Sequence, residues 1–283
     1  MENISEIGFE FIKTLGWELN NGKLELPAFP DVALRIKKVL EDPDVSAEQV
    51  ALVVGSEPVL SARLLKVANS AMLNTAGVQI NDIRTAITRL GFNMVHNTAV
   101  SIAMEQIIVS ETASSTLREE LEDLWRGSLR VAALSYVIAK KQTSIKPDEA
   151  MLAGLLHDIG KIYIWTRVET KFPELFQEKE TLEDIIQQWY TGVGSTILRA
   201  WSFSESVSTA VDEQENLDRT HFGSPDLADV VLVANLYANL DKPGQDWTKI
   251  SAIERLNLSP ETVSPILDES MDEVQSVMQA LGY

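Results

Sequence analysis

Cysteine is absent from the 283 residues, and histidine occurs only three times. Without cysteine the chain has no disulfide framework, no thiolate nucleophile and no cysteine-based zinc site. Any metal site must therefore use carboxylates and, at most, the three imidazoles of His96, His157 and His221.

Long hydrophobic runs are also missing. No window approaches the run of about eighteen uncharged apolar residues that a membrane-spanning helix requires. The N-terminal segment carries Glu2, Glu6 and Glu10 among its apolar residues, which is unlike a secretory signal. We therefore expect a cytoplasmic protein that does not attach to membranes.

Positive charge is scarce as well. Lysine and arginine number 24 against 42 acidic residues, which gives a formal net charge of −18. Because such a surface repels phosphate backbones, we expect no nucleic-acid binding. The acidic excess is strongest in residues 151–283, where 9 basic residues face 22 acidic ones. We interpret this excess as a solvated face in preference to an acidic docking site for a basic partner.

Apolar residues recur with helical spacing along most of the chain, and no segment alternates like a strand, so the sequence predicts an all-α fold. Small polar residues before these segments predict where helices begin. The predicted starts are Asp31, Ser46 with Gln49 as a capping box, Asn81 or Asp82, Pro147, Thr181, Ser204, Ser224-Pro225 and Ser259-Pro260.

One cluster combines groups that carry chemistry, the segment from His157 to Lys161. The adjacent pair His157-Asp158 can place an imidazole and a carboxylate on one divalent cation. A site of about four to six ligands needs further groups from elsewhere in the chain. Alternatively, His157 packs among apolar neighbours and Asp158 caps the turn that ends at Gly160. Lys161 can contact a phosphate or stay solvated.

The sequence around this pair resembles the HD superfamily of metal-dependent phosphohydrolases, and the upstream half resembles its HDOD branch. Several short motifs match in order and spacing. They are Leu26-Pro27, Pro30, Asp42-Pro43, Glu57-Pro58, Leu64-Leu65, Ala68-Asn69-Ser70-Ala71, Ile83 to Gly91, and Leu155 to Lys161. The resemblance implies a multi-helix HD-like fold, with an N-terminal helical lobe in residues 1–109 and an HD-like lobe in residues 110–283. It also implies a bacterial signal-transduction role.

The departures from the family pattern bear on activity. Relative to HD phosphohydrolases and the related HD-GYP phosphodiesterases, several expected ligand positions carry other residues. Gly127 stands where a first histidine is expected, Tyr190 where another is expected, Gln214-Glu215 where a histidine pair is expected, and Asn235 where the closing aspartate is expected. A neutral amide is a weaker ligand than a carboxylate, and a phenol must ionise to bind well.

The resemblance and these departures predict a signalling module that is not an enzyme and carries no cofactor. We expect it to act on protein partners or to bind a small ligand. The predicted vestigial pocket comprises Gly127, His157, Asp158, Lys161, Tyr190, Gln214, Glu215 and Asn235. One alternative is a divergent metal-dependent phosphohydrolase of nucleotides or cyclic dinucleotides, with a divalent metal on His157, Asp158 and Glu215, joined by His221. Another is a sensor whose former metal pocket binds a nucleotide-like ligand without cleaving it.

Overall fold

The computed structural model describes residues 6–25, 29–70, 74, 77–111, 114–239, 247–258 and 271–281. All regular secondary structure in these ranges is helical, so the all-α prediction is confirmed. The elements are α1 (Glu6–Asn21), α2 (Asp31–Leu40), α3 (Ala47–Gly55), α4 (Pro58–Ala68), α5 (Ile83–Leu90), α6 (Phe92–Glu111), α7 (Ser115–Gln142), α8 (Pro147–Leu156), α9 (Ile159–Lys171), the 3-10 helix η1 (Pro173–Gln177), α10 (Lys179–Ala200), α11 (Glu205–Glu213), α12 (Leu227–Ala238), the 3-10 helix η2 (Trp247–Lys249), α13 (Ser251–Arg255) and α15 (Met271–Leu281).

Several helices begin where polar side chains predict. The Ser46 hydroxyl oxygen accepts a hydrogen bond from the backbone N–H of Gln49. The side-chain oxygen of Gln49 accepts one from the backbone N–H of Ser46, which completes the predicted capping box of α3. Asp82 accepts from the backbone N–H of Thr85 at 2.8 Å and starts α5. Ser204 caps α11 in the same way. Local hydrogen bonding therefore decides these starts.

Other predicted starts are wrong. The N-cap of α12 is Asp226, which forms a capping box with Asp229, so the helix begins after Ser224-Pro225. The capping box of Asp226 with Asp229 satisfies backbone N–H groups at both ends, so Asp226 is the N-cap in preference to Ser224. Helix α2 does begin at Asp31, but its N-cap residue is Pro30, so Asp31 is not the cap. Helix α10 begins at Lys179, before Thr181. The helix start predicted at Ser259-Pro260 lies outside the described residues.

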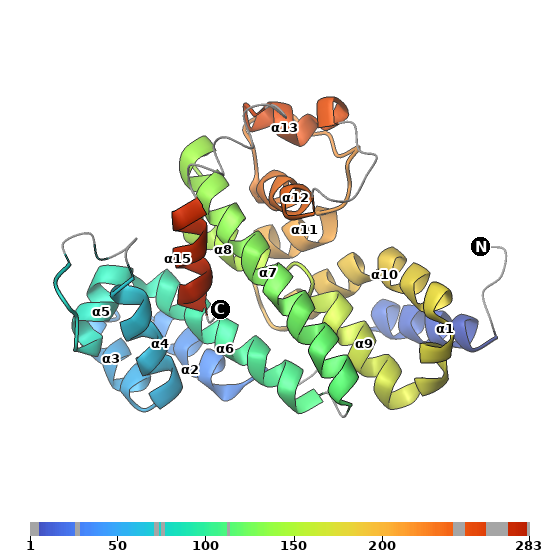
Figure 1. Cartoon of the computed structure of the whole chain (residues 1–283), viewed down its shortest axis with the longest axis horizontal. Coiled ribbons are helices and arrows are strands. Elements are labelled where there is room, and N and C mark those ends of the chain that lie inside the picture. The colour runs from blue at the N-terminus through green and yellow to red at the C-terminus, as the bar shows by residue number, and fades with distance from the viewer. Residues whose placement is uncertain are drawn as a thin grey trace.

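The long helix α7 is the centre of the molecule, and α8 packs along it so closely that their backbones touch (Figure 1). A Cβ atom added to Gly154 of α8 would lie 2.8 Å from the Cα atom of Ala132 and from the Ser135 hydroxyl. The two helices can approach so closely because position 154 has no side chain. Helix α12 also contacts both α7 and α8, and α11 contacts α12 and α8.

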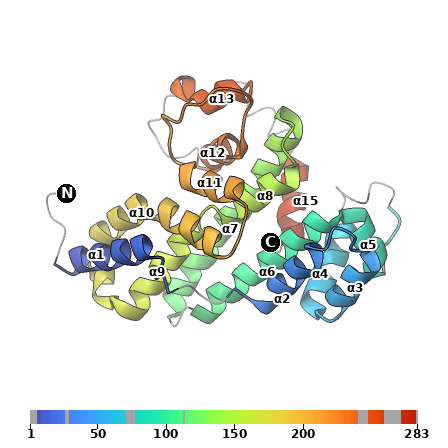
Figure 2. The ribbon, with the colours of Figure 1, turned by 180° about the vertical axis from the view of Figure 1, so that it is seen from behind.

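Two groups of helices flank this centre. Helices α2 to α5 pack around α6 at one end, while α9, η1 and α10 lie at the other end with α1 alongside them (Figure 2). Phe11 of α1 meets Phe172 edge to face, with ring centroids 5.2 Å apart. The two groups share one hydrophobic core that runs through α6 and α7.

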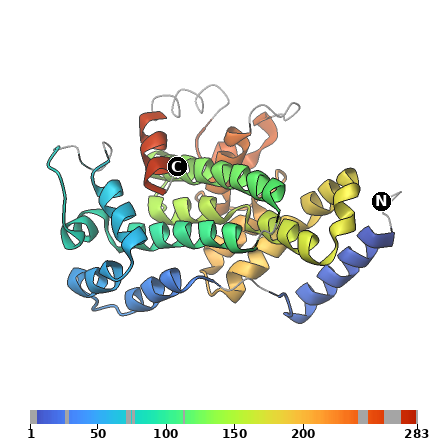
Figure 3. The same cartoon turned by 60° about the horizontal axis from the view of Figure 1, so that its bottom comes forward.

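The C-terminal helix α15 returns to the N-terminal helices. It packs on α7, α4 and α6 (Figure 3). The carbonyl oxygen of Leu281 accepts hydrogen bonds from the Arg63 guanidinium at 3.1 Å and from the Ser101 hydroxyl. The division into lobes at residues 109 and 110 stays a prediction. Among the described residues no helix has the length and apolarity to cross a membrane.

Candidate functional site

The His157-Asp158 pair lies at the junction of α8 and α9. Helix α8 ends at Leu156, and Asp158 is the N-cap residue of α9, although its side chain caps no backbone N–H. Gly160, in the first turn of α9, lies against α10. A Cβ atom at position 160 would be 1.9 Å from the carbonyl oxygen of Tyr190. This glycine therefore permits the contact that places Tyr190 beside the His-Asp pair.

Asp158 has a cation within the chain as its counter-ion. Its Oδ1 atom lies 2.9 Å from the Nζ atom of Lys161, one helical turn later. The same ammonium group lies 4.2 Å from the centroid of the Tyr190 ring, within the range of a cation–π interaction. The carboxylate is 5% exposed and Tyr190 is fully buried. The site thus holds a positive charge beside its carboxylate without an added ion.

His157 is also buried, at 2% exposure. Its Nδ1 atom lies 2.8 Å from the carbonyl oxygen of Gly154, which can only accept, so Nδ1 carries the proton. Burial lowers the pKa of His157, against the opposing effect of the Asp158 charge. The imidazole is therefore neutral near pH 7. Its Nε2 atom faces Oδ2 of Asp158 at 3.4 Å.

Three further predicted residues complete this cluster. The Gln214 amide donates to the carbonyl oxygen of His157 at 2.6 Å, and Asn235 donates to Gln214 at 3.4 Å. Glu215 hydrogen-bonds to the Gln187 amide. Burial, followed by the negative charges of Asp158 and Glu215, raises the pKa of Tyr190, so the phenol stays protonated. Amides and a phenol thus line the place where ligands are expected.

Gly127 differs from the other predicted residues. It is exposed on α7, and an added Cβ atom there would meet nothing within 4 Å. Space for a side chain exists at position 127, but glycine has no atom that can join the cluster. This residue therefore contributes neither a ligand nor a hydrogen bond through a side chain.

The residues present do not fit the divalent metal of an HD phosphohydrolase. His157 and Asp158 offer two adjacent ligand atoms, but their neighbours Gln214 and Asn235 are neutral amides. The Tyr190 phenol is buried and stays protonated. Ligands with lone pairs and negative charge are needed to hold such an ion, and these side chains do not supply a full set.

His221 does not converge on His157. Among the described residues, the group of histidine and carboxylate ligand atoms that lie within 4.8 Å of one another is formed by His221, Asp226 and Asp229. The Asp229 side chain is fully buried and accepts from His221 at 2.9 Å, from Arg219 at 2.9 Å, and from Arg255. Two guanidinium groups thus already compensate these carboxylates, so the cluster is a set of ion pairs.

This second cluster ties the loop before α12 to α13. Burial would raise the pKa of Asp229, but hydrogen bonds from Arg255 and His221 lower it to about 2. The Ser251 hydroxyl and the Arg255 guanidinium both donate to the carbonyl oxygen of Arg219. From the sequence alone, His221 is predicted only as a metal ligand. Asp226 and Asp229, spaced as a capping box, were the signal for this helix start.

Comparison with known proteins identifies relatives of the whole chain. The family model described as HDOD domain matches residues 26–217. A structure from Shewanella amazonensis, described as a candidate metal-dependent phosphohydrolase, is 28% identical, with a TM-score of 0.81 and coverage of 98% of this chain and 100% of that one. An HDOD domain protein of unknown function from Geobacter sulfurreducens is 25% identical, with a TM-score of 0.70 and coverage of 96% and 99%.

One curated relative is longer than this chain. An uncharacterised protein of Treponema pallidum (strain Nichols) is 23% identical over 225 residues, which make up 75% of this chain and 42% of that protein. The chain therefore spans less than half the length of this relative.

Proposed function

The chain belongs to the HDOD family, and we propose that it is a regulatory module whose His-Asp site does not hydrolyse phosphoesters. In this proposal the protein has the helical fold of a hydrolase but uses it to bind a partner or ligand. Hydrolysis by this superfamily needs a metal-activated water, and activation needs a full ligand set. The signal-transduction role that the sequence resemblance implies supports the regulatory part.

One observation carries the proposal: neutral groups stand around His157 and Asp158 where the resemblance implies metal ligands. Gln214 and Asn235 are amides in contact with one another, and burial keeps the Tyr190 phenol protonated. A metal ion at Asp158 would have to accept these neutral groups as further ligands. This requirement weakens metal binding.

We propose that the module acts through a protein partner or a small ligand. A cavity of about 350 Å³ lies between α2, α6, α8 and the turn from α10 to α11, which supports the second mode. The side chains of Lys37, His96 and Phe203 line this cavity. Burial lowers the pKa of His96, so its imidazole is neutral. A thermal-shift screen with nucleotides tests this mode, because saturating ligand stabilises the folded state.

Metal content tests the absence of hydrolysis. The protein is purified without chelator, loaded with manganese or iron, and analysed by mass spectrometry beside the double variant His157→Ala, Asp158→Ala. We expect no stoichiometric metal in either protein and no metal-stimulated cleavage of a phosphodiester. Stoichiometric metal that is lost in the double variant, together with hydrolysis, would establish the divergent phosphohydrolase instead.

A further inference from the structure

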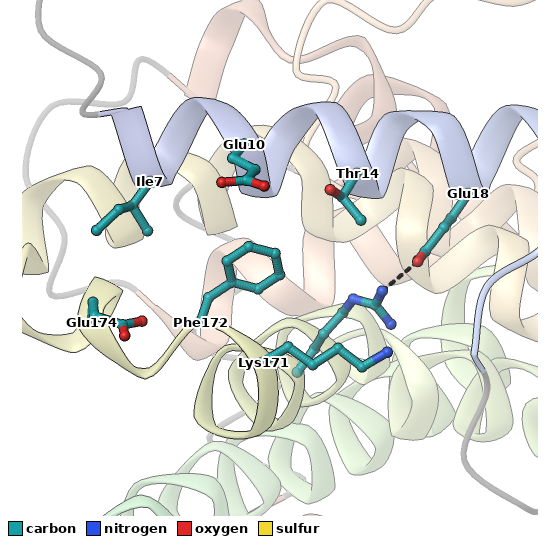
Figure 4. A pocket seen from close by; sticks show the side chains of 8 residues that line it. Ile7, Glu10, Thr14, Glu18, Lys171, Phe172 and Glu174 are labelled. Atoms are coloured by element: carbon teal, nitrogen blue, oxygen red, sulfur yellow. Dashed lines mark hydrogen bonds and ion pairs between the residues drawn. The ribbon is translucent and has the colours of Figure 1, made fainter.

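A groove separates α1 from η1 and from the C-terminal half of α9, the helix that follows the His-Asp pair. It encloses about 610 Å³, and both walls contribute side chains (Figure 4). Glu10 and Glu18 point into it from α1, and Phe172 and Glu174 face them. The matched family region begins at residue 26, so α1 lies outside it. The groove exists because α1 packs on the family fold.

The cations beside the groove already have partners. Arg167 is 5% exposed and is ion-paired with Glu18 on the opposite wall. Its NH1 group also donates to the Tyr163 hydroxyl at 3.0 Å. Lys171 pairs with Glu25. The positive charges of this region are therefore compensated before any occupant arrives.

The other end of the groove has carboxylates without such compensation. Glu10 and Glu174 are exposed, and among the described residues neither forms a hydrogen bond or ion pair. Ile7 and the Phe172 ring lie beside them (Figure 4). Two negative charges next to an aromatic and an aliphatic surface suit a side chain with a cationic head and an apolar stem.

The central ion pair adds an independent sign of a missing occupant. The Nε atom of Arg167 and the Oε2 atom of Glu18 are both buried without a hydrogen-bond partner. A buried donor and a buried acceptor without partners are both costly. A peptide group offers one acceptor and one donor, so it can satisfy both. Neighbouring side chains shield these atoms, and an occupant must displace them to make the bonds.

We propose that this groove binds an extended basic segment of a partner protein. An arginine or lysine side chain of the segment lies on Phe172 and Ile7 with its head between Glu10 and Glu174. A main-chain amide of the segment reaches the Arg167–Glu18 pair. The net charge of −18 attracts such a segment from a distance. The acidic surface is then a docking feature at this groove.

The test uses the acetylated and amidated pentapeptide Ala-Arg-Ala-Arg-Ala, with Ala-Glu-Ala-Glu-Ala as its acidic counterpart. Isothermal titration gives Kd, and amide chemical shifts locate the site. We expect saturable binding of the basic peptide alone, with shifts confined to α1, the end of α9 and η1. Free arginine amide binds more weakly because it lacks the further main-chain groups. No saturation up to about 5 mM peptide, or shifts centred elsewhere, would overturn the proposal.

A matched pair of variants separates this site from general attraction to an acidic protein. The variant Glu10→Gln, Glu174→Gln removes two charges from the groove, and Glu119→Gln, Glu122→Gln removes two exposed charges from α7. We expect Kd to rise about tenfold in the first and to change less than about twofold in the second. Equal weakening in both variants would show non-specific attraction and refute the groove. Neither outcome depends on metal or hydrolysis.

Discussion

A Cβ atom on Gly160 would lie 1.9 Å from the carbonyl oxygen of Tyr190. This backbone contact sets the distance between α9 and α10, and with it the position of the Tyr190 ring over the Lys161 ammonium. The His-Asp cluster therefore depends on a position that has no side chain. The contact is structural, and it explains why the site keeps its shape without a metal ligand at Tyr190.

The variant Gly160→Ala is expected to lose about 3 kcal/mol of stability, because the added methyl group forces two backbones apart. Gly127→Ala is its control on α7, where a Cβ atom meets nothing within 4 Å. That exchange should stabilise the protein by about 0.5–1 kcal/mol through helix propensity. Urea denaturation measures both. Equal effects at the two positions would contradict the packing argument.

The variant Lys161→Met is expected to cost about 2 kcal/mol near pH 7, because a buried carboxylate loses its counter-charge. Adding Asp158→Asn should restore most of this loss, since the uncompensated charge is then gone. A double-mutant cycle by chemical denaturation gives the coupling between the two residues. Additive losses would mean that the ion pair does not stabilise the site.

Asp229 is expected to make the protein sensitive to acid. Its folded pKa of about 2 lies below the ordinary value of 3.8, so its contribution of about 2 kcal/mol is complete above about pH 4 and is lost as the pH falls toward 2. Asp229→Asn removes this contribution, takes the carboxylate partner from Arg255 and leaves Arg219 with Asp226 and Glu213. Denaturation as a function of pH should show the difference between the two proteins shrinking below about pH 4. A constant difference would refute this assignment.

His157 is expected to stay neutral at about pH 6, with the proton on Nδ1, because burial lowers its pKa. An unfolded chain binds a proton at about pH 6.5, so the contribution of His157 to stability is present above that pH and declines below it. Long-range ¹H–¹⁵N spectra report the tautomer and the charge of the ring. A doubly protonated ring at about pH 6 would instead indicate an ion pair with Asp158.

Local signals predicted much of the fold. The Ser46–Gln49 capping box and the Asp82 cap use atoms within one helical turn, so the sequence is sufficient to place them. Helix α1 was not predicted. It is stabilised by packing on α10 and η1, which lie far away in sequence. The length of α10, which extends to Ala200, likewise depends on packing against α9 and α11.

The sequence predicted most residues of the candidate site, but not the ion pairs and hydrogen bonds between them. The family pattern located Tyr190, Gln214 and Asn235, and the structure brings the two amides into contact below His157. The pairing of Lys161 with Asp158 was missed, although the spacing of three residues in a helix allows it. The ion pair between Asp229 and Arg255 spans 26 residues, and no local pattern specifies it.

The hydrogen bond from Ser101 to the Leu281 carbonyl joins residues 180 positions apart. During synthesis at 5–20 residues per second, α6 emerges roughly 9–36 s before the segment that covers it. During that interval the surfaces of α4 and α6 that α15 covers are open to solvent and to chaperones. The N-terminal helices therefore reach their final packing only after residues 271–281 have been synthesised.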